Sequence, residues 1–425
     1  MNRREYLKLL TAATCLVGSS HLLTSRSTAS LPKDEIPLTP KDEILERIKK
    51  YRPSLEGAVP ANLNHRLGAA HAAGRYHLTN EPFLLEGAKK LLEFGTNICK
   101  LWLDSIELKR LYGFNSDWSA LPRKFRPIDI VKHPYFDEVF HLPFSTIVLE
   151  TTRLTGVRPY NSPDNCFIDT PDDDFVEYEE MFEELTEYFY KRFAKRPVTF
   201  ILQNWEGDWL FNGETVTEWN QQMLDDLPRR IDCYTRWFAA RQRGVEKARK
   251  RFVGDKTVAC RVIHAVEVNR VLTLLEGTPT LTQLVLPNVK PDLVSWSAYD
   301  GMGSAEDLWH GIELIRHYMK HSGFLPEPTL MVGELGFPER GRTKEEIVEF
   351  WDRSLAVFFA QNIPLVFVWE LFCNEITEEA KKKPAPENGI YPADDLFGFW
   401  LYRPDGSLSH AGQFLKDVLQ TAGGQ

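Results

Sequence analysis

Residues 199–208 read Thr-Phe-Ile-Leu-Gln-Asn-Trp-Glu-Gly-Asp, and residues 329–336 read Thr-Leu-Met-Val-Gly-Glu-Leu-Gly. Each begins with a short apolar run, as expected of a parallel strand buried on both faces, and a glutamate follows near its end. In the first run, alternate residues from Phe200 to Glu206 would share one face of the strand. A carboxylate at the end of such a strand is costly to desolvate unless it is paired or used. These two strand ends are therefore the first places to look for function.

Apolar, β-branched runs of this kind occur eight times along the chain and alternate with helical patterns. The predicted strands are 66–72, 97–103, 145–150, 198–205, 257–265, 293–299, 329–334 and 364–371. Eight strand–helix units in one chain predict an α/β fold with a single (β/α)8 barrel, the TIM barrel. An open, doubly wound parallel sheet is the alternative.

The intervals between these strands carry helix signals. Gly95 ends one amphipathic pattern, and Ser304 stands at the start of another. Thr343 and Glu346 form a capping box ahead of a third. Connections from helix to strand are short, whereas the longest segments follow strands: 104–135, 151–172, 206–225 and 372–406. In a barrel these long loops all lie at the carboxyl-terminal face, where barrel enzymes carry their chemistry.

Composition excludes several classes of protein. The chain has 425 residues, 43% of them hydrophobic and 26% charged, which argues against a disordered or multi-span membrane protein. Because the net charge is −9, we do not expect a basic surface that binds nucleic acid. After residue 29 five cysteines remain, widely spaced and odd in number, so neither a disulfide framework nor a structural zinc site is expected.

The first 29 residues resemble a bacterial twin-arginine export signal. Arg3 and Arg4 precede a mostly apolar run, 9–23, and Ala29 ends a stretch of small residues suited to signal cleavage. The resemblance implies a periplasmic or secreted protein that meets the twin-arginine (Tat) export machinery and keeps no membrane span after cleavage. An uncleaved anchor or a chance arginine pair is the alternative. The predicted division is 1–29 signal peptide, 30–55 lead-in segment and 56–425 barrel.

Glu206 and Glu334 together suggest chemistry on a glycosidic bond. One carboxylic acid would protonate the leaving oxygen, while the other carboxylate would attack the anomeric carbon. In a retaining enzyme of this kind the two carboxyl groups lie about 5–5.5 Å apart.

With these two residues on its fourth and seventh strands, the chain resembles the clan A glycoside hydrolases, which are retaining (β/α)8 enzymes. The resemblance implies that Glu206 is the acid/base, that Glu334 is the nucleophile, and that Asn204 contacts a sugar hydroxyl. In the clan the asparagine directly precedes the acid/base, but here Trp205 intervenes. The same resemblance implies that Tyr299 bonds the nucleophile and that Trp369 forms the floor of the sugar site.

Other polar and aromatic residues at predicted strand ends are candidates for the site. Five tryptophans lie at or just beyond predicted strand ends: Trp205, Trp209, Trp219, Trp296 and Trp369. Trp369 and Trp209 are the first choices to stack on a pyranose, since an indole presents an apolar face and a polar N–H. His264, at the end of the fifth predicted strand, is a candidate for substrate binding. Lys100 and Asp104 bracket the end of the second strand.

Two alternatives to the glycosidase remain. In a metal-dependent sugar isomerase or epimerase, the carboxylates and imidazole at the strand ends would ligate a divalent cation, the set being Glu206, His264, Asp300, Glu334 and Glu370. A barrel that only binds glycans would need the aromatic residues but not both glutamates. The leading hypothesis needs no metal or cofactor and takes a poly- or oligosaccharide as its substrate.

Overall fold

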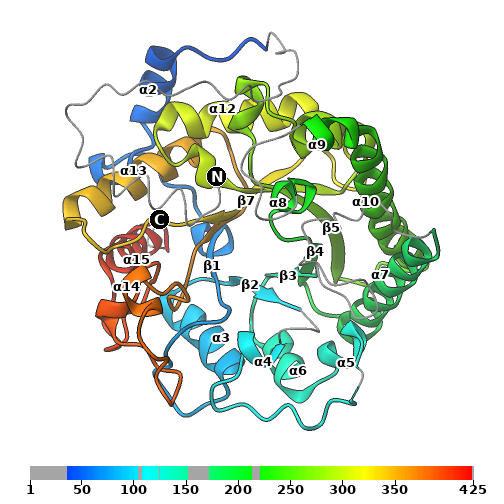
Figure 1. Ribbon diagram of the computed structural model, residues 1–425, viewed down its shortest axis with the longest axis horizontal. Helices are drawn as coiled ribbons and strands as arrows, with labels where there is room; N and C mark the ends of the chain where they lie inside the picture. Colours follow the sequence, from blue (N-terminus) through cyan, green and yellow to red (C-terminus); the bar gives the residue numbers. More distant parts are fainter. Residues whose placement is uncertain (1–35, 104–107, 124, 152–171, 213–220, 424–425) are drawn as a thin grey trace.

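The computed structural model describes residues 36–103, 108–123, 125–151, 172–212 and 221–423, so residues 1–29 lie outside the described part. Eight parallel strands close into a barrel in the order β1 to β8, and helices surround it (Figure 1). The single (β/α)8 barrel is thereby confirmed, and the open sheet is excluded. The strands are β1 (Leu67–Ala70), β2 (Ile98–Trp102), β3 (Thr146–Glu150), β4 (Thr199–Gln203), β5 (Arg261–Val268), β6 (Leu293–Ser297), β7 (Leu330–Leu335) and β8 (Val366–Val368).

Helices of very different length precede and follow the strands. The longer ones are α2 (Lys41–Lys49), α3 (Phe83–Phe94), α6 (Pro134–His141), α7 (Asp172–Phe193), α10 (Leu227–Arg249), α12 (Ala305–Tyr318), α13 (Lys344–Ala360) and α15 (His410–Gly423). The shorter ones are α4 (Leu108–Leu111), α5 (Pro127–Val131), α8 (Gly207–Asn212), α9 (Gln221–Asp225), α11 (Leu281–Leu284) and α14 (Glu378–Lys381). The described residues also form six short 3-10 helices: η1 (Pro53–Leu55), η2 (Leu63–His65), η3 (Leu272–Glu276), η4 (Leu286–Asn288), η5 (Ala298–Gly301) and η6 (Ala393–Asp395). No helix in these described ranges is both long and apolar enough to cross a membrane.

The helix signals read from the sequence are confirmed at their caps. Gly95 ends α3 with a φ of 107°, which an L-residue rarely adopts. The Ser304 hydroxyl accepts the backbone N–H of Asp307 at the start of α12. Thr343 and Glu346 form the expected capping box of α13.

The outer face of the barrel is buried against the helices. On β4, Phe200 stacks on Phe189 of α7, with ring centroids 4.1 Å apart. Ile201, the next residue, instead belongs to the cluster that fills the barrel. Alternate strand residues therefore face the helices and the barrel interior, as the strand period requires.

The segment before the barrel is packed against its helices. In α2, Ile44 and Ile48 are buried, and Thr39 just before it bonds Glu313 of α12 through both its N–H and its hydroxyl. Farther along, Asp352 of α13 accepts the N–H of Ser54 at 2.6 Å. Part of the predicted 30–55 lead-in thus lies against α12 and α13.

The predicted bounds of two strands miss by three residues or more. The eighth was expected at 364–371, whereas β8 is Val366–Val368, and the fifth is also displaced. It was expected at 257–265, whereas β5 runs from Arg261 to Val268. The last residues of β5 therefore lie three positions farther along than expected. This shift changes which side chains reach the carboxyl end of the barrel.

Candidate active site

The barrel interior changes from apolar to polar toward the carboxyl ends of the strands. The apolar layer consists of Ile98, Val148, Ile201, Ile263, Ala265, Leu293, Met331 and Phe367. Beyond it lies a polar layer without solvent exposure: Lys100, Gln203, Glu267, Ser295 and Glu334. Charged groups that are fully buried must be paired and hydrogen-bonded, and the contacts within this layer meet that requirement.

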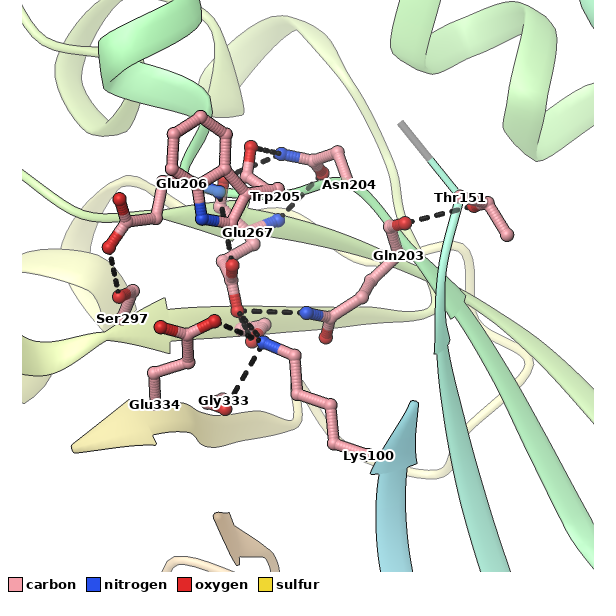
Figure 2. A network of polar contacts seen from close by, with 11 residues as sticks. Lys100, Thr151, Gln203, Asn204, Trp205, Glu206, Glu267, Ser297, Gly333 and Glu334 are labelled. Atoms are coloured by element: carbon pink, nitrogen blue, oxygen red, sulfur yellow. Dashed lines mark hydrogen bonds and ion pairs between the residues drawn. The ribbon is translucent and has the colours of Figure 1, made fainter. Parts of the chain in front are cut away.

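Glu267, near the end of β5, is the centre of the polar layer (Figure 2). Its Oε2 accepts bonds from Gln203 Nε2 at 2.9 Å and from Ser295 Oγ at 2.8 Å. The same oxygen lies 3.2 Å from Lys100 Nζ. Its Oε1 accepts the backbone N–H of Glu206 at 3.1 Å. Strands β2, β4, β5 and β6 are thus joined through one carboxylate.

Lys100, on β2, joins this carboxylate to that of Glu334. Its Nζ lies 3.0 Å from Glu334 Oε1 and 3.2 Å from the carbonyl oxygen of Gly333. Burial disfavours the charged ammonium, but the carboxylates of Glu267 and Glu334 outweigh this effect and raise the pKa of Lys100. The ammonium therefore stays charged between two glutamates.

Glu206 reaches the site because the chain turns where β4 ends. Its φ is 23°, and α8 begins at the next residue, Gly207. A Cβ on Gly207 would lie 2.6 Å from the carbonyl oxygen of Glu267, so this close approach requires a glycine. Glu206 is 3% exposed, and its Oε1 accepts a hydrogen bond from the hydroxyl of Ser297 on β6 at 2.7 Å. The turn thus carries the side chain over the end of β6.

Glu334 reaches the same place through an irregularity in β7. The register pairs Trp296 with Val332 and then Ser297 with Glu334, so two residues of β7 stand opposite one step of β6. Such a bulge re-aims a side chain, and here Gly333 and Glu334 both contact Lys100. The Ser297 hydroxyl bonds Glu206, and Ser297 stands opposite Glu334 in the strand register, so both predicted glutamates lie beside Ser297 at the end of β6.

Asn204 lies between β4 and β5 and its amide is engaged with the backbone. Its Nδ2 donates to the carbonyl oxygen of Glu267 at 2.9 Å, and its Oδ1 accepts the N–H of Glu267 at 2.9 Å. Asn204 thereby fixes the position of Glu267 relative to β4. The contact with a sugar hydroxyl that the resemblance implied has no support from this arrangement.

His264 lies away from the site. Because β5 extends to Val268, this residue is in mid-strand and faces α10, where its Nδ1 lies 3.0 Å from Gln242 Oε1. Burial, followed by the charges of Arg241 and Arg249, holds its pKa well below the usual value. His264 is thus a neutral residue packed outside the barrel, and the prediction that places it at a strand end is wrong by the boundary error of β5.

Two tryptophans lie at the ends of β2 and β8. The rings of Trp102 and Trp369 meet edge to face, with centroids 5.5 Å apart. Lys100 Nζ lies 5.0 Å from the ring centroid of Trp102, and Trp369 Nε1 donates to Glu375 at 3.3 Å. These rings therefore border the polar layer on the side opposite Glu267.

The other predicted aromatic residues are dispersed. Trp209, on α8, lies under the guanidinium of Arg270 at 5.1 Å. Tyr299 is half-buried in η5, directly beyond β6. Trp296 faces α12, since a Cβ on Gly311 would lie 2.2 Å from its ring, and so it packs the core. Trp219 and Asp104 are outside the described residues.

The predicted metal set is not brought together. In the part of the chain that the structure describes, no three His, Cys, Asp or Glu side chains are placed to hold a metal ion. His264 faces the helices, and Glu370 Oε1 accepts the N–H of Asn374 at 2.9 Å. Asp300 accepts bonds from Leu272 and Trp296, and its burial raises its pKa to about 7.

Sequence reasoning missed the central residue of the site, Glu267. It also placed Lys100 only near the end of a strand. A usable signal exists, since Lys100, Gln203, Glu267 and Ser295 are polar residues within predominantly apolar strand runs. What was lacking is the true end of β5, which places Glu267 within the strand, on the inward face that it shares with Ile263 and Ala265.

Comparison with known proteins supports the fold. No family model and no curated protein sequence matches the chain. The structure of GH5_18 from Streptomyces cattleya in complex with GlcNAc matches with a TM-score of 0.51 at 12% identity, over 84% of this chain and 80% of that one. The exo-beta-1,4-mannosidase Op5Man5 from Opitutaceae bacterium strain TAV5 matches with a TM-score of 0.52 at 10% identity, over 84% of this chain.

The chain covers 60% of the mannosidase chain, which is less than two thirds of it. At identities this low, the likeness establishes the architecture alone. The protein therefore has a (β/α)8 barrel of the kind found in glycoside hydrolases. What it does with that barrel has to be argued from its own residues.

Proposed function

We propose that the protein is a retaining glycoside hydrolase in which Glu334 is the nucleophile and Glu206 is the acid/base. The observation that carries this proposal is the convergence of the two glutamates on Ser297 at the end of β6. The two carboxyl groups differ in their surroundings. Glu334 is paired with an ammonium, whereas Glu206 accepts a neutral hydroxyl. Such a difference separates a permanent carboxylate from a group that exchanges a proton.

In the first step, the Glu334 carboxylate would attack the anomeric carbon and form an ester as the bond to the leaving oxygen breaks. Glu206 would give its proton to that oxygen. In the second step, Glu206 would take a proton from water, whose oxygen replaces Glu334 at the anomeric carbon. The product keeps the anomeric configuration, and both side chains return to their starting states.

The substrate we propose is a poly- or oligosaccharide. The paired rings of Trp102 and Trp369 would offer an apolar surface to the C–H face of a sugar. The neighbouring structures act on or bind sugars according to their own descriptions, which supports a carbohydrate in general and leaves the sugar and linkage open.

The test is release of reducing ends from a panel of β-glucans, mannans, xylans and galactans. Wild type would be compared with Glu206→Gln, Glu334→Gln and a matched control, Glu86→Gln, in which a buried glutamate outside the site accepts two backbone amides. We expect wild type and the control to release product and both site variants to fall to background. Inversion of the anomeric configuration, followed by proton NMR, would contradict the retaining mechanism. Binding of a glycan by folded wild type without any release would support a binding barrel instead.

We also propose that residues 1–29 direct export. Replacing Arg3 and Arg4 with lysine should leave the precursor in the cytoplasm of a twin-arginine-competent host. If the wild-type precursor and the double-lysine variant are exported equally, as measured by cell fractionation, the twin-arginine route is contradicted.

A further inference from the structure

We propose that Glu267 is a third functional glutamate, a positioning residue that holds the acid/base Glu206 in place through its backbone N–H. This inference rests on the proposed function and adds a role that neither glutamate of a two-carboxylate mechanism supplies. Its basis is geometric: Glu267 is fully buried, and its Oε1 accepts the Glu206 N–H at 3.1 Å (Figure 2).

The backbone at Glu206 needs such a restraint. A φ of 23° is rare for a residue with a side chain, and it persists only where the surroundings impose it. The N–H bond to Glu267 acts at that residue itself. Asp208, two positions farther on, is fixed separately, because its carboxylate accepts the backbone N–H groups of Asn269, Arg270 and Leu281. The turn that presents the acid/base is thus held on both sides by β5 and the residues that follow it.

Glu267 can act as a restraint because its other oxygen is immobilised. Oε2 accepts hydrogen bonds from Lys100, Gln203 and Ser295, which lie on three different strands. A Cβ on Gly333 would lie 2.3 Å from the same oxygen, so the carboxylate has no room to move toward β7. The side-chain amide of Asn204 bonds the backbone of Glu267 twice, with its nitrogen to the carbonyl oxygen and with its oxygen to the N–H. The carboxylate is therefore a fixed acceptor rather than a mobile side chain.

The contact requires a carboxylate, because only an ionised group offers acceptors on both oxygens. A glutamine at 267 that turned its oxygen to Lys100, Gln203 and Ser295 would turn its NH2 against the Glu206 N–H. The reverse orientation would turn the NH2 against the Lys100 ammonium. In the first orientation the Glu206 N–H loses its acceptor. In the second, Lys100, Gln203 and Ser295 all lose the acceptor that Oε2 provides.

The kinetic test uses two variants, Glu267→Gln and Glu267→Asp, against wild type and the Glu86→Gln control. Aspartate keeps the charge beside Lys100 but withdraws the oxygen from Glu206. The probes are pairs of aryl β-glycosides of each common sugar, one with 2,4-dinitrophenol as leaving group and one with 4-methylphenol. Because a poor leaving group needs a proton and a good one does not, displacement of the acid/base should affect only the second of each pair.

We expect both variants to lose about 10²–10³-fold in kcat/KM on the 4-methylphenyl glycoside, within the range for a general acid. On the 2,4-dinitrophenyl glycoside we expect the rate of the first half-reaction, in which the aryl group leaves, to fall by less than about 10-fold. The alkaline limb of the kcat/KM profile for the 4-methylphenyl glycoside should also shift in the variants. A loss that is equal for both leaving groups would overturn the proposal, because it would reflect a general structural defect or an effect on Glu334.

Hydrogen exchange gives a second readout that does not depend on turnover. The backbone amide hydrogen of Glu206 should exchange with solvent deuterium faster in both Glu267 variants than in wild type or in Glu86→Gln. Mass spectrometry of a peptide that spans Glu206 measures this rate. Unchanged exchange would overturn the proposal even if activity falls. Absence of turnover by folded wild type on every glycoside would instead overturn the proposed function, and with it the catalytic role of Glu267.

Discussion

Replacing Lys100 with methionine should destabilise the protein in a strongly pH-dependent way. The ammonium lies 3.0 Å from Glu334 and 3.2 Å from Glu267, and none of the three side chains is exposed. Without it, two buried carboxylates face each other without a counter-charge, and breaking a buried pair in this way costs about 3–5 kcal/mol.

The variant can relieve this repulsion by binding one proton. Protonating a carboxyl group with an ordinary pKa of about 4.3 costs about 3.7 kcal/mol at pH 7 but only about 1 kcal/mol at pH 5. The shared pKa of the pair is raised in the folded variant, so its stability relative to wild type must increase as the pH falls. The deficit should therefore shrink by about 2.7 kcal/mol between pH 7 and pH 5.

The assay is thermal unfolding at matched scan rate from pH 5 to pH 8. For 425 residues at about 2.1 cal/mol/K per residue, the unfolding entropy is roughly 0.9 kcal/mol/K, so the expected loss in Tm is about 4 °C at pH 7 and about 1 °C at pH 5. Lys247→Met, which removes an exposed pair with Glu183, serves as the control and should follow wild type throughout. A Lys100→Met deficit that stays constant with pH would refute the reasoning, since lost packing alone would then account for it.

Three further perturbations test other parts of the structure. Gly333→Ala would place a Cβ 2.0 Å from Ser295 Oγ, and a loss of about 1–3 kcal/mol in urea denaturation is expected; a neutral effect would contradict the tight interior. Burial lowers the pKa of His71 to about 4, so the free energy of unfolding should fall by up to about 3 kcal/mol as the pH falls from about 6.5 to 4. In His71→Gln, the free energy of unfolding measured in urea should depend less on pH over this range. An unchanged pH dependence would contradict that assignment. Asp352→Asn weakens the bonds to the Arg52 side chain and to the backbone N–H of Ser54, so limited proteolysis near residues 36–55 should accelerate, whereas equal cleavage rates would show that other contacts hold this segment.

The fold was predictable because it rests on repeated local patterns. Each of the eight strands overlaps an apolar run, and the Ser304 and Thr343 caps are satisfied by short-range bonds that the sequence spells out. Such signals depend on neighbours a few residues apart. The barrel follows from their number and order, because eight alternating units leave few ways to bury both faces of a parallel sheet.

The polar layer could not be predicted in the same way. The bonds that define it join residues 28 to 234 positions apart, such as Ser295 with Glu267 and Lys100 with Glu334. Whether a residue takes part depends on which face of its strand it occupies, and a shift of one residue reverses that face. A strand that ends three residues early leaves Glu267 outside it and makes His264, which faces the helices, the polar residue nearest its end.

The two glutamates were found for a reason that differs from the one the structure gives. Strict alternation from Phe200 would point Glu206 toward the helices with Phe200 itself, and strict alternation from Met331 would do the same for Glu334. Both reach the interior because the regular strand fails at that point, by the turn at Glu206 and by the bulge in β7. Irregular backbone of this kind persists only where surrounding bonds hold it. Here those bonds come from Glu267, Lys100 and Ser297, so the residues that hold the irregularities are also those that surround the two carboxylates.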